Sequence, residues 1–415
     1  MTISRRGAVA VLGAAAFAPP ALAQQDQGYA EDARALIDLI FENYAYPERL
    51  RGFPEQRLRT LRESEAQRVT SARELVGFGE RALAALFDHH AILNSSRADS
   101  YALVPSYADL WIEANAGDRY VIEDVRQGTP AAEAGLAPGD VLVGVDGAPM
   151  AQAIGAYIGA PAAALTRAQA SVCARVLAAG RRDRARRLTI TRGRRRRTLA
   201  LANCYQQPIA RGEGGVSVRR HGDVTQVRFN DSLGDDALCT GFPALIREAA
   251  DTPALVLDLR DTASGGNSSV ARAVMGCFID EPQPYQRHEL PEEQRRTGVR
   301  RSWIEEVSPL GARYGGRVVV LVGRWTGSMG EGMAMGFDAI GAPVIGSRMA
   351  GLLGAIYDLP LPHSGIVLKL PVERLAHVNG APRERYAPPH LLAHADALVA
   401  GRDAGLEAAL ARAGG

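Results

Sequence analysis

From about Val216 onward, short apolar runs alternate with segments of helical periodicity, and this alternation restricts the fold more than any other feature of the chain. The runs typical of strands are Val224–Phe229, Ala254–Leu259, Val318–Val322, Val344–Ile345 and Ile366–Leu370. The segments typical of helices are Ala237–Ala250, Ser269–Phe278 and Gly330–Ile340. Strands that alternate with helices predict an α/β layer. A continuously apolar run such as Val318–Val322 is typical of a parallel strand that is buried on both faces.

The first 23 residues have the pattern of an export signal. Ser4-Arg5-Arg6 precedes the apolar stretch Ala8–Ala18, and Ala21-Leu22-Ala23 forms an A-x-A cleavage site. The Ser-Arg-Arg start resembles a twin-arginine signal. We therefore expect residues 1–23 to be removed and the mature protein to be periplasmic or secreted. The alternative interpretation is a cytosolic helix that packs its alanine-rich run.

Charge and cysteine content exclude several classes of protein. Residues 1–23 hold two arginines and no acid, so the remaining chain carries equal numbers of basic and acidic residues. This balance argues against nucleic acid or an anionic membrane surface as the main partner, and no later stretch is long and apolar enough to span a bilayer. The four cysteines are widely spaced without a CxxC pair, which argues against a zinc or redox site. In an oxidising compartment one or two disulfides remain open.

Two regions precede the α/β layer. Residues 24–110 are mostly helical in pattern, with apolar spacing of three and four in Ala33–Tyr44 and Glu63–Phe87. In residues 111–203, β-like runs flank the string Gly128–Asp140, which together with Gly147 resembles the PAxxAGLxxGDxxxxVDG signature of PDZ domains in exported bacterial proteases. We expect one inserted helix between Met150 and Gly180. PDZ domains bind extended peptides by adding a strand to a sheet edge.

Two glycine-containing motifs follow predicted strands of the α/β layer. Asp258–Gly266 reads DLRDTASGG, and Gly327–Glu331 reads GSMGE. A serine at a strand-to-helix turn stands at the edge of the sheet, where backbone N–H groups and the helix dipole stabilise a developing oxyanion. Ser328 therefore has the position of a nucleophile. The alternative interpretation is that Ser328 only caps a helix.

The two motifs together, DLRxxxxGG and GSxGE about 60 residues apart, resemble the catalytic domain of the C-terminal processing (tail-specific) serine peptidases. The order of a helical region, a PDZ domain and an α/β domain is also that of this family. The resemblance implies a crotonase-like α/β peptidase domain over residues 204–390. The residue pattern of the tail itself predicts a C-terminal helix over 391–415. It implies Ser328 as nucleophile, the Met329 amide as one oxyanion donor, and the Gly265 or Gly266 amide as the second.

The lysine content separates this chain from the commoner members of that family, which use a Ser–Lys dyad. The segment that matches their lysine loop, Gly346–Gly354, contains no lysine, and Lys369 is the only lysine of the chain. Arginine does not replace lysine as a base because a guanidinium stays protonated. Lys369 lies in the alternating run Ile366–Leu370, where we expect it to face solvent. A histidine base is then expected.

Another branch of the family, typified by the tricorn protease core, takes a histidine from the helical region ahead of the PDZ domain. Its Ser-His-Ala-Tyr motif resembles His89-His90-Ala91-Ile92 here, which implies His90 as the base and leaves His89 as the alternative. The branch also uses a downstream glutamate, and Glu384 is the matching candidate. Asp88 is a further candidate to orient either ring. Adjacent histidines diverge on a helix, so we expect neither a metal nor another cofactor.

These residues predict an exported serine endopeptidase that acts on peptide or protein substrates through a Ser/His-based site with PDZ-assisted binding. The first alternative is a catalytically inactive protein that binds a peptide or lipid on the same scaffold. The second alternative is an esterase or amidase acting on small molecules. The oligomeric state is left open by the sequence.

Overall fold

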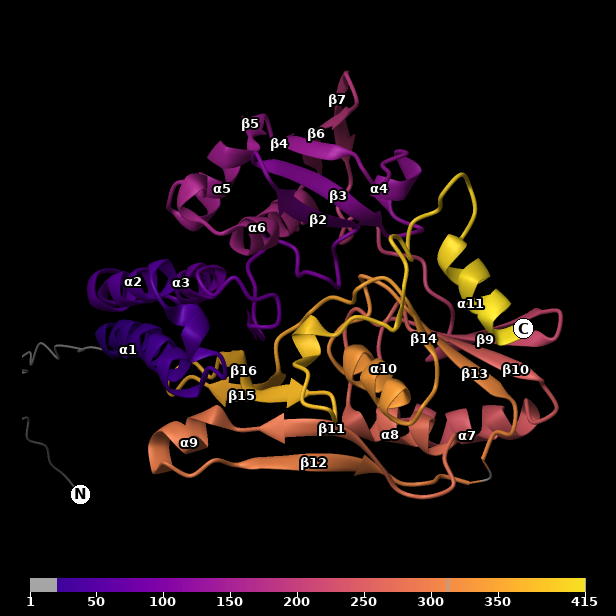
Figure 1. Cartoon of the computed structure of the whole chain (residues 1–415). Coiled ribbons are helices and arrows are strands. Elements are labelled where there is room, and N and C mark those ends of the chain that lie inside the picture. Colours follow the sequence, from indigo (N-terminus) through magenta and orange to yellow (C-terminus); the bar gives the residue numbers. More distant parts are fainter. Residues whose placement is uncertain (1–20, 312, 415) are drawn as a thin grey trace, which may run out of the picture.

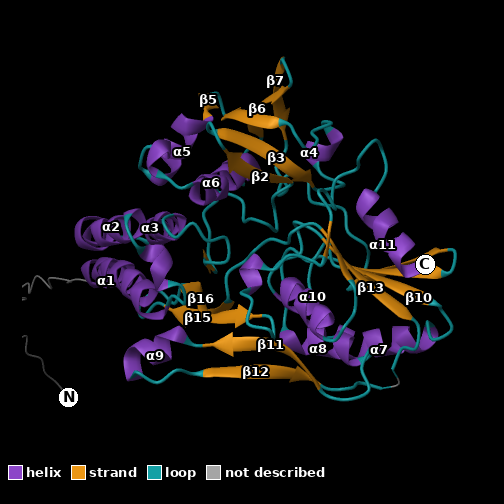
Figure 2. Ribbon diagram, viewed as in Figure 1, coloured by secondary structure: helices purple, strands orange, loops and turns teal. Residues whose placement is uncertain are grey.

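A computed structural model describes residues 21–311 and 313–414 of the chain. A helical region, a PDZ-like sheet and an α/β domain surround the centre of the molecule (Figure 1; Figure 2 colours the same view by secondary structure). Of the expected signal segment, residues 1–23, the first 20 residues lie outside the described part of the chain. Helix α1 (Ala21–Asn43) begins at the last three residues of that segment. Within the described part of the chain, no helix has the length and apolarity needed to cross a membrane.

The N-terminal region contains α1, α2 (Phe53–Thr60) and α3 (Ala72–Ala84). Ser71 begins α3 because its side chain accepts a hydrogen bond from the Glu74 amide at 3.3 Å. These helices share one hydrophobic core with a sheet from much later in the chain, because Leu36, Ile40 and Phe78 pack in the same cluster as Leu368 and Leu370. The helical region is therefore joined to the α/β domain rather than independent of it.

The sheet that completes this core has five strands in the order β1-β16-β11-β12, with β15 also paired to β16. The apolar runs of the sequence predict only part of β16 among these strands. Strands β11, β12 and β15 carry many exposed or half-buried polar residues and therefore lack such a run. A short helix, α9 (Pro291–Thr297), connects β11 to β12. The strands are β1 (Ile92–Leu93), β11 (Gln283–Glu289), β12 (Ser302–Val307), β15 (Ala355–Pro360) and β16 (Val367–Ala376).

The PDZ-like domain is a six-stranded antiparallel sheet with three helices. Its sheet order is β2-β3-β4-β6-β7, with β5 paired to β4. The sequence predicts one inserted helix, and the structure has two, α5 (Met150–Ile158) and α6 (Arg167–Ala179), because Gly159 in the left-handed conformation ends the first and Thr166 caps the second. The remaining elements are β2 (Leu110–Asn115), β3 (Arg119–Val125), α4 (Pro130–Glu133), β4 (Val141–Val145), β5 (Ala148–Pro149), β6 (Arg186–Arg192) and β7 (Arg195–Leu201).

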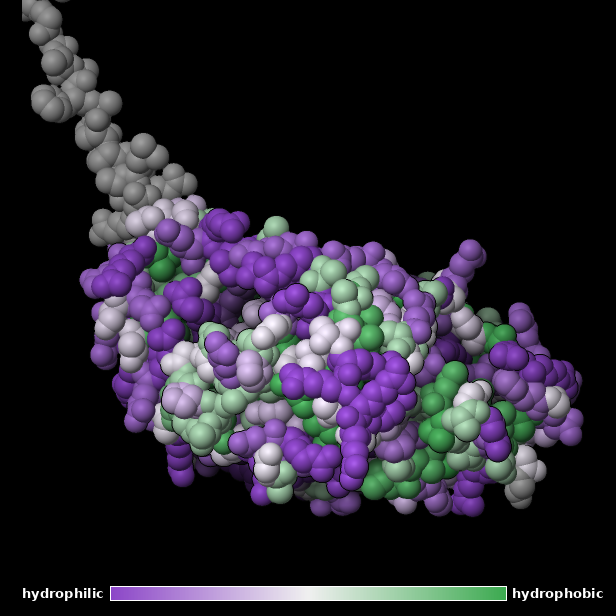
Figure 3. All heavy atoms as spheres, turned by 90° about the horizontal axis from the view of Figure 1, so that it is seen from above, coloured by the Kyte–Doolittle hydropathy of each residue, from purple (hydrophilic) through white to green (hydrophobic). Residues whose placement is uncertain are grey.

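One edge of the PDZ-like sheet, the outer edge of strand β2, is covered by side chains of α6. Arg175 Nε donates to the Ile112 carbonyl at 3.1 Å, and the Ala114 amide donates to Ser171 Oγ at 2.8 Å. Arg175 also forms an ion pair with Glu113 at 2.6 Å and lies 4.4 Å above the Trp111 ring. Two backbone groups on this edge are therefore already hydrogen-bonded from within the domain. Figure 3 shows the molecule from above the view of Figure 1, the side on which the PDZ-like domain lies, and on this face hydrophilic residues alternate with hydrophobic patches.

The α/β domain is built on a six-stranded sheet in the order β17-β14-β13-β10-β9-β8, parallel except for β8. Helices α7, α8 and α10 contribute to the core on one face, and α11 packs on the other. Strand β10 is buried at every position, as the apolar run predicts. The elements are β8 (Val216–His221), β9 (Val224–Phe229), α7 (Leu238–Glu248), β10 (Ala254–Asp258), α8 (Ser268–Gly276), β13 (Arg317–Val322), α10 (Met329–Ala339), β14 (Val344–Gly346), β17 (His390–Leu391) and α11 (Ala404–Gly414).

The structure shortens the expected C-terminal helix and settles whether the cysteines form disulfides. The C-terminal helix covers only Ala404–Gly414 rather than residues 391–415. The segment before it stays irregular because the amides of Ala395, Asp396 and Ala397 donate to the buried Asp124 carboxylate of the PDZ-like domain. All four cysteines are free thiols, so the structure contains no disulfide among them.

Candidate active site

Ser328 lies between β13 and α10, at the strand-to-helix turn that the sequence predicts. It is half-buried and has φ 49° and ψ −113°, a conformation that is costly for a residue with a side chain. Its own amide donates to Glu331 Oε2 at 2.9 Å. A strained turn at the end of a buried strand projects the Ser328 side chain beyond the sheet, as in a nucleophile elbow.

The turn with the two predicted glycines approaches Ser328 closely. A Cβ placed on Gly265 would lie 2.6 Å from Ser328 Cβ, 3.1 Å from its Oγ and 3.5 Å from the Met329 amide nitrogen. Gly265 has φ 72°, so both its backbone and its surroundings favour glycine. The Gly265 amide donates to the Thr262 carbonyl at 3.0 Å. The amides of Gly266 and Met329 have no acceptor among the described residues, so both remain available as hydrogen-bond donors.

Glu331 connects Ser328 to the loop after β14. Its carboxylate accepts hydrogen bonds from the Ser328, Gly351 and Leu352 amides at 2.9, 2.8 and 3.1 Å. Burial raises the pKa of this carboxyl to about 7, although the three amides and the Arg383 charge oppose the rise. Glu331 therefore holds the Ser328 backbone and the Gly351–Leu352 backbone in one arrangement.

His90 lies against the same loop from the opposite region of the chain. Its Nδ1 is 2.6 Å from the Leu353 carbonyl oxygen, which only accepts, so Nδ1 carries the proton. Nε2 is then the ring nitrogen that can accept a proton. Burial, helped by the Arg383 charge, lowers the pKa of His90 to about 4. The ring is therefore neutral at physiological pH, in the form that a general base requires.

The segment that carries His90 is fixed by Asp88 and Tyr44. Asp88 Oδ1 accepts from the His90 backbone amide at 2.9 Å, and Oδ2 accepts from the Tyr44 hydroxyl at 2.9 Å. Burial raises the pKa of Asp88 to about 6. Asp88 thus holds the histidine backbone, and among the described contacts the ring itself is oriented by Leu353.

Arg383, for which the sequence gives no signal, contacts the backbone around Ser328, whereas the resemblance implies Glu384. Its Nη1 is 3.3 Å from the Ser328 carbonyl, and its Nη2 is 3.0 and 2.6 Å from the Leu352 and Gly354 carbonyls. Glu384 is half-buried, forms no hydrogen bond with Ser328 or His90, and leaves Oε2 without a partner among the residues described. The sequence signal for this segment was the family resemblance that put Glu384 forward.

Two other predicted residues lie apart from this arrangement. His89 lines a separate cavity, and its Nε2 has no partner in the described chain. Lys369 Nζ forms an ion pair with Asp358 at 2.7 Å on strands β15 and β16, and Asp358 is largely exposed. No described contact connects Lys369 with Ser328.

Comparison with known proteins gives the following similarities. Residues 232–389 match the profile of peptidase family S41, and residues 121–160 match that of the PDZ domain. No curated protein sequence matches the chain significantly. Among solved structures, the photosystem II D1 C-terminal processing protease is 17% identical with TM-score 0.53, covering 88% of this chain and 93% of that one.

Two further structures have the same architecture. Mature CPAF is 15% identical with TM-score 0.56, covering 90% of this chain and 93% of that one. A putative peptidase from Parabacteroides merdae ATCC 43184 is 15% identical with TM-score 0.52, covering 92% and 95%. At these identities the likeness concerns the fold, and it extends over the helical region, the PDZ-like domain and the α/β domain together.

Proposed function

We propose that this chain, whose residues 232–389 match the profile of peptidase family S41, is an exported serine peptidase in which Ser328 is the nucleophile and His90 the base. Export is proposed from the N-terminal sequence alone. The observation that most supports the base is the 2.6 Å contact between His90 Nδ1 and the Leu353 carbonyl, which leaves Nε2 with a free lone pair. Leu353 adjoins Leu352, which Glu331 ties to the Ser328 amide.

The proposed reaction is acyl transfer. Ser328 Oγ attacks the peptide carbonyl while His90 Nε2 accepts the hydroxyl proton, and the carbonyl oxygen becomes an oxyanion that the Met329 and Gly266 amides stabilise. Collapse breaks the C–N bond, and His90 returns the proton to the departing amine. Water then repeats the sequence on the acyl-enzyme, and the carboxylic acid product leaves Ser328 free.

Arg383 and Glu331 are positioning residues in this proposal. Arg383 ties the carbonyls of Ser328, Leu352 and Gly354 together, and its positive charge is one cause of the lowered pKa of His90. The Ser–Lys dyad of the commoner members has no counterpart here, because Lys369 is engaged with Asp358.

The role of the PDZ-like domain is also proposed. Because Arg175 and Ser171 occupy the β2 edge, strand addition by a substrate requires these side chains of α6 to be displaced. Substrate chains that displace them would be admitted, and others would not.

The proposal is tested by incubating the mature protein with an unfolded protein such as reduced casein at pH 7.5 and following new N-termini. We expect cleavage by the wild type, none by Ser328→Ala, and at least a hundredfold loss in His90→Ala. Lys369→Met is the matched control and retains activity. Cleavage by Ser328→Ala would overturn the nucleophile. Absence of cleavage in the wild type, together with retained peptide binding, would favour the inactive binding protein.

A further inference from the structure

A cavity of about 500 Å³ lies between the N-terminal helices and the PDZ-like domain, apart from Ser328. It is lined by α3, by residues 87–104, by α5 and α6, and by arginines after α6. Its volume falls in the range of sites that hold small ligands. Ser328, Met329 and the two glycines of the oxyanion turn are not among its lining residues, so it is distinct from the candidate active site.

The wall of the cavity is mainly apolar. Its apolar side chains come from the helical region and from the PDZ-like domain alike, and they include Leu83, Val104, Val145, Val172 and Leu177. A surface of this kind binds an apolar ligand because the ligand is removed from water. Each methylene group that is buried raises the affinity about fourfold.

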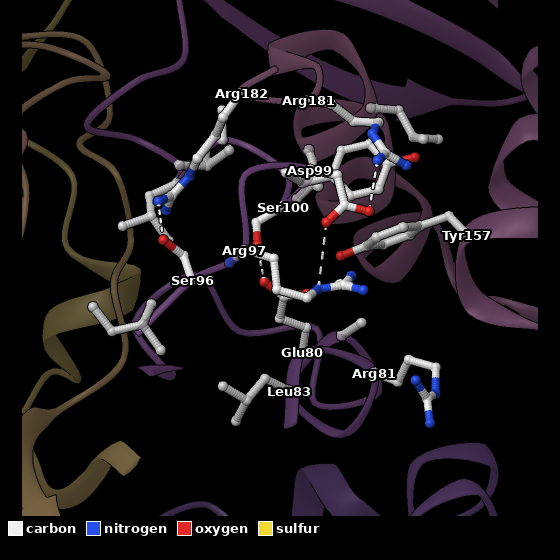
Figure 4. Close-up of a pocket in the computed structure, with 18 of the residues that line it drawn as sticks. Glu80, Arg81, Leu83, Ser96, Arg97, Asp99, Ser100, Tyr157, Arg181 and Arg182 are labelled. Carbon is white, nitrogen blue, oxygen red and sulfur yellow. Dashed lines mark hydrogen bonds and ion pairs between the residues drawn. The ribbon is translucent and has the colours of Figure 1, made fainter. Parts of the chain in front are cut away.

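Most charged groups of the cavity are already paired. Arg97 lies 2.9 Å from Glu80, and Arg181 lies 2.8 Å from Asp99. Figure 4 shows Arg97, Asp99 and Arg181 as one group beside Tyr157, with Arg182 and Ser96 as a separate pair across the cavity. The pairing leaves these two arginines little capacity for a ligand anion.

Arg182 differs from the other arginines. It is half-buried and donates through Nη1 to Ser96 Oγ, and within the described residues it has no carboxylate partner. Its Nε is buried and has no hydrogen-bond partner in the described chain. The Tyr205 ring lies 4.7 Å from the guanidinium and holds its orientation. A guanidinium that lines a cavity without a carboxylate partner keeps its charge for a ligand anion.

We propose that this cavity binds a small amphipathic monocarboxylate, an unbranched apolar chain that ends in a carboxylate. The carboxylate lies on Arg182, in the charge-assisted geometry that guanidinium groups provide, and the chain lies on the apolar wall. A single unpaired guanidinium matches a single negative charge, and the apolar lining excludes a polyanion or a sugar as the preferred occupant.

The cavity also adjoins the candidate active site through the chain itself. Phe87 and His89 line the cavity, while His90 faces the Leu353 carbonyl. Phe87 has φ 50°, so the segment is held in a costly conformation by its surroundings. Binding itself does not rest on the proposed function, because no residue of the oxyanion turn takes part.

The test is isothermal titration of the mature protein with decanoate, octanoate and decanol. We expect decanoate to bind about 15-fold more tightly than octanoate, because two methylenes are added, and decanol to bind at least tenfold more weakly than decanoate. Arg182→Gln should weaken decanoate at least tenfold. Arg184→Gln is the matched control, because Arg184 also lines the cavity but its side chain is 56% exposed and 3.6 Å from Asp146, and it should leave binding unchanged.

Three results would overturn the proposal: no saturable binding of decanoate, equal affinities for decanoate and decanol, or equal losses in Arg182→Gln and Arg184→Gln. If Arg182→Gln does not fold, Ala156→Trp on α5 provides the second variant, because it fills the cavity without changing a charge. Circular dichroism establishes that this variant is folded, and retained decanoate binding by it would equally overturn the proposal.

Discussion

Replacing Gly265 with alanine should separate the fold from the proposed chemistry. The added Cβ would lie 2.6 Å from Ser328 Cβ. Carbon atoms pack at about 3.5–4.0 Å, so the nucleophile must move by about 1 Å. A displacement of that size costs about 100-fold in rate. The positive φ of Gly265 adds about 1–2 kcal/mol of backbone strain, which alters stability but not reactivity.

Gly298→Ala is the matched control. Gly298 has φ 76° at the end of α9, and a Cβ there meets no atom within 4 Å. Both variants should lower the Tm by a few degrees, but only Gly265→Ala should slow the second-order reaction of the protein with a fluorophosphonate probe, by about 100-fold. An unchanged rate in Gly265→Ala, or an equal loss in Gly298→Ala, would refute the steric reasoning.

Three further changes test separate contacts of the site. Burial raises the pKa of Glu331 to about 7, so as pH falls through that value the carboxylate that anchors the three amides is protonated and the free-energy cost of burying its charge is relieved. The rate at which the wild type reacts with the probe should therefore fall between pH 8 and 6, whereas the rate of Glu331→Gln should be lower at pH 8 and nearly independent of pH. Parallel pH profiles of the two proteins would exclude Glu331 as the origin of the fall. Tyr44→Phe removes the hydroxyl from buried Asp88 and should cost about 1–3 kcal/mol in chemical unfolding; no loss would contradict its structural role. Arg175→Met frees the Ile112 carbonyl and should strengthen binding of a C-terminal peptide of a cleaved substrate, measured by fluorescence anisotropy; weaker binding would argue against α6 as a cover.

The parts of the site that local sequence pattern predicts are those built on buried strands. Ser328, Gly265 and Gly266 each follow a continuously apolar run, and runs of that kind place their carboxyl ends at one sheet edge. The strand-to-helix turn of Ser328 is visible for the same reason.

The parts that the sequence left hidden depend on distant contacts or on polar strands. Arg383 lies 55 residues from the Ser328 carbonyl that it contacts, and Tyr44 lies 44 residues from Asp88, so no local period indicates either pairing. Strands β11 and β12 carry exposed polar side chains and lack an apolar alternation. Residues 391–403 lose their expected helix because Asp124 binds three of their backbone amides, an effect of tertiary contact on local propensity.

The central claim, that a neutral His90 rather than the single lysine activates Ser328, is tested most directly by mapping the fluorophosphonate adduct by mass spectrometry at pH 7.5. We predict an adduct on Ser328 in the wild type and in Lys369→Met at equal rates, and a rate at least 100-fold lower in His90→Ala. An adduct that forms at the wild-type rate in His90→Ala, or that is lost in Lys369→Met, would contradict the account.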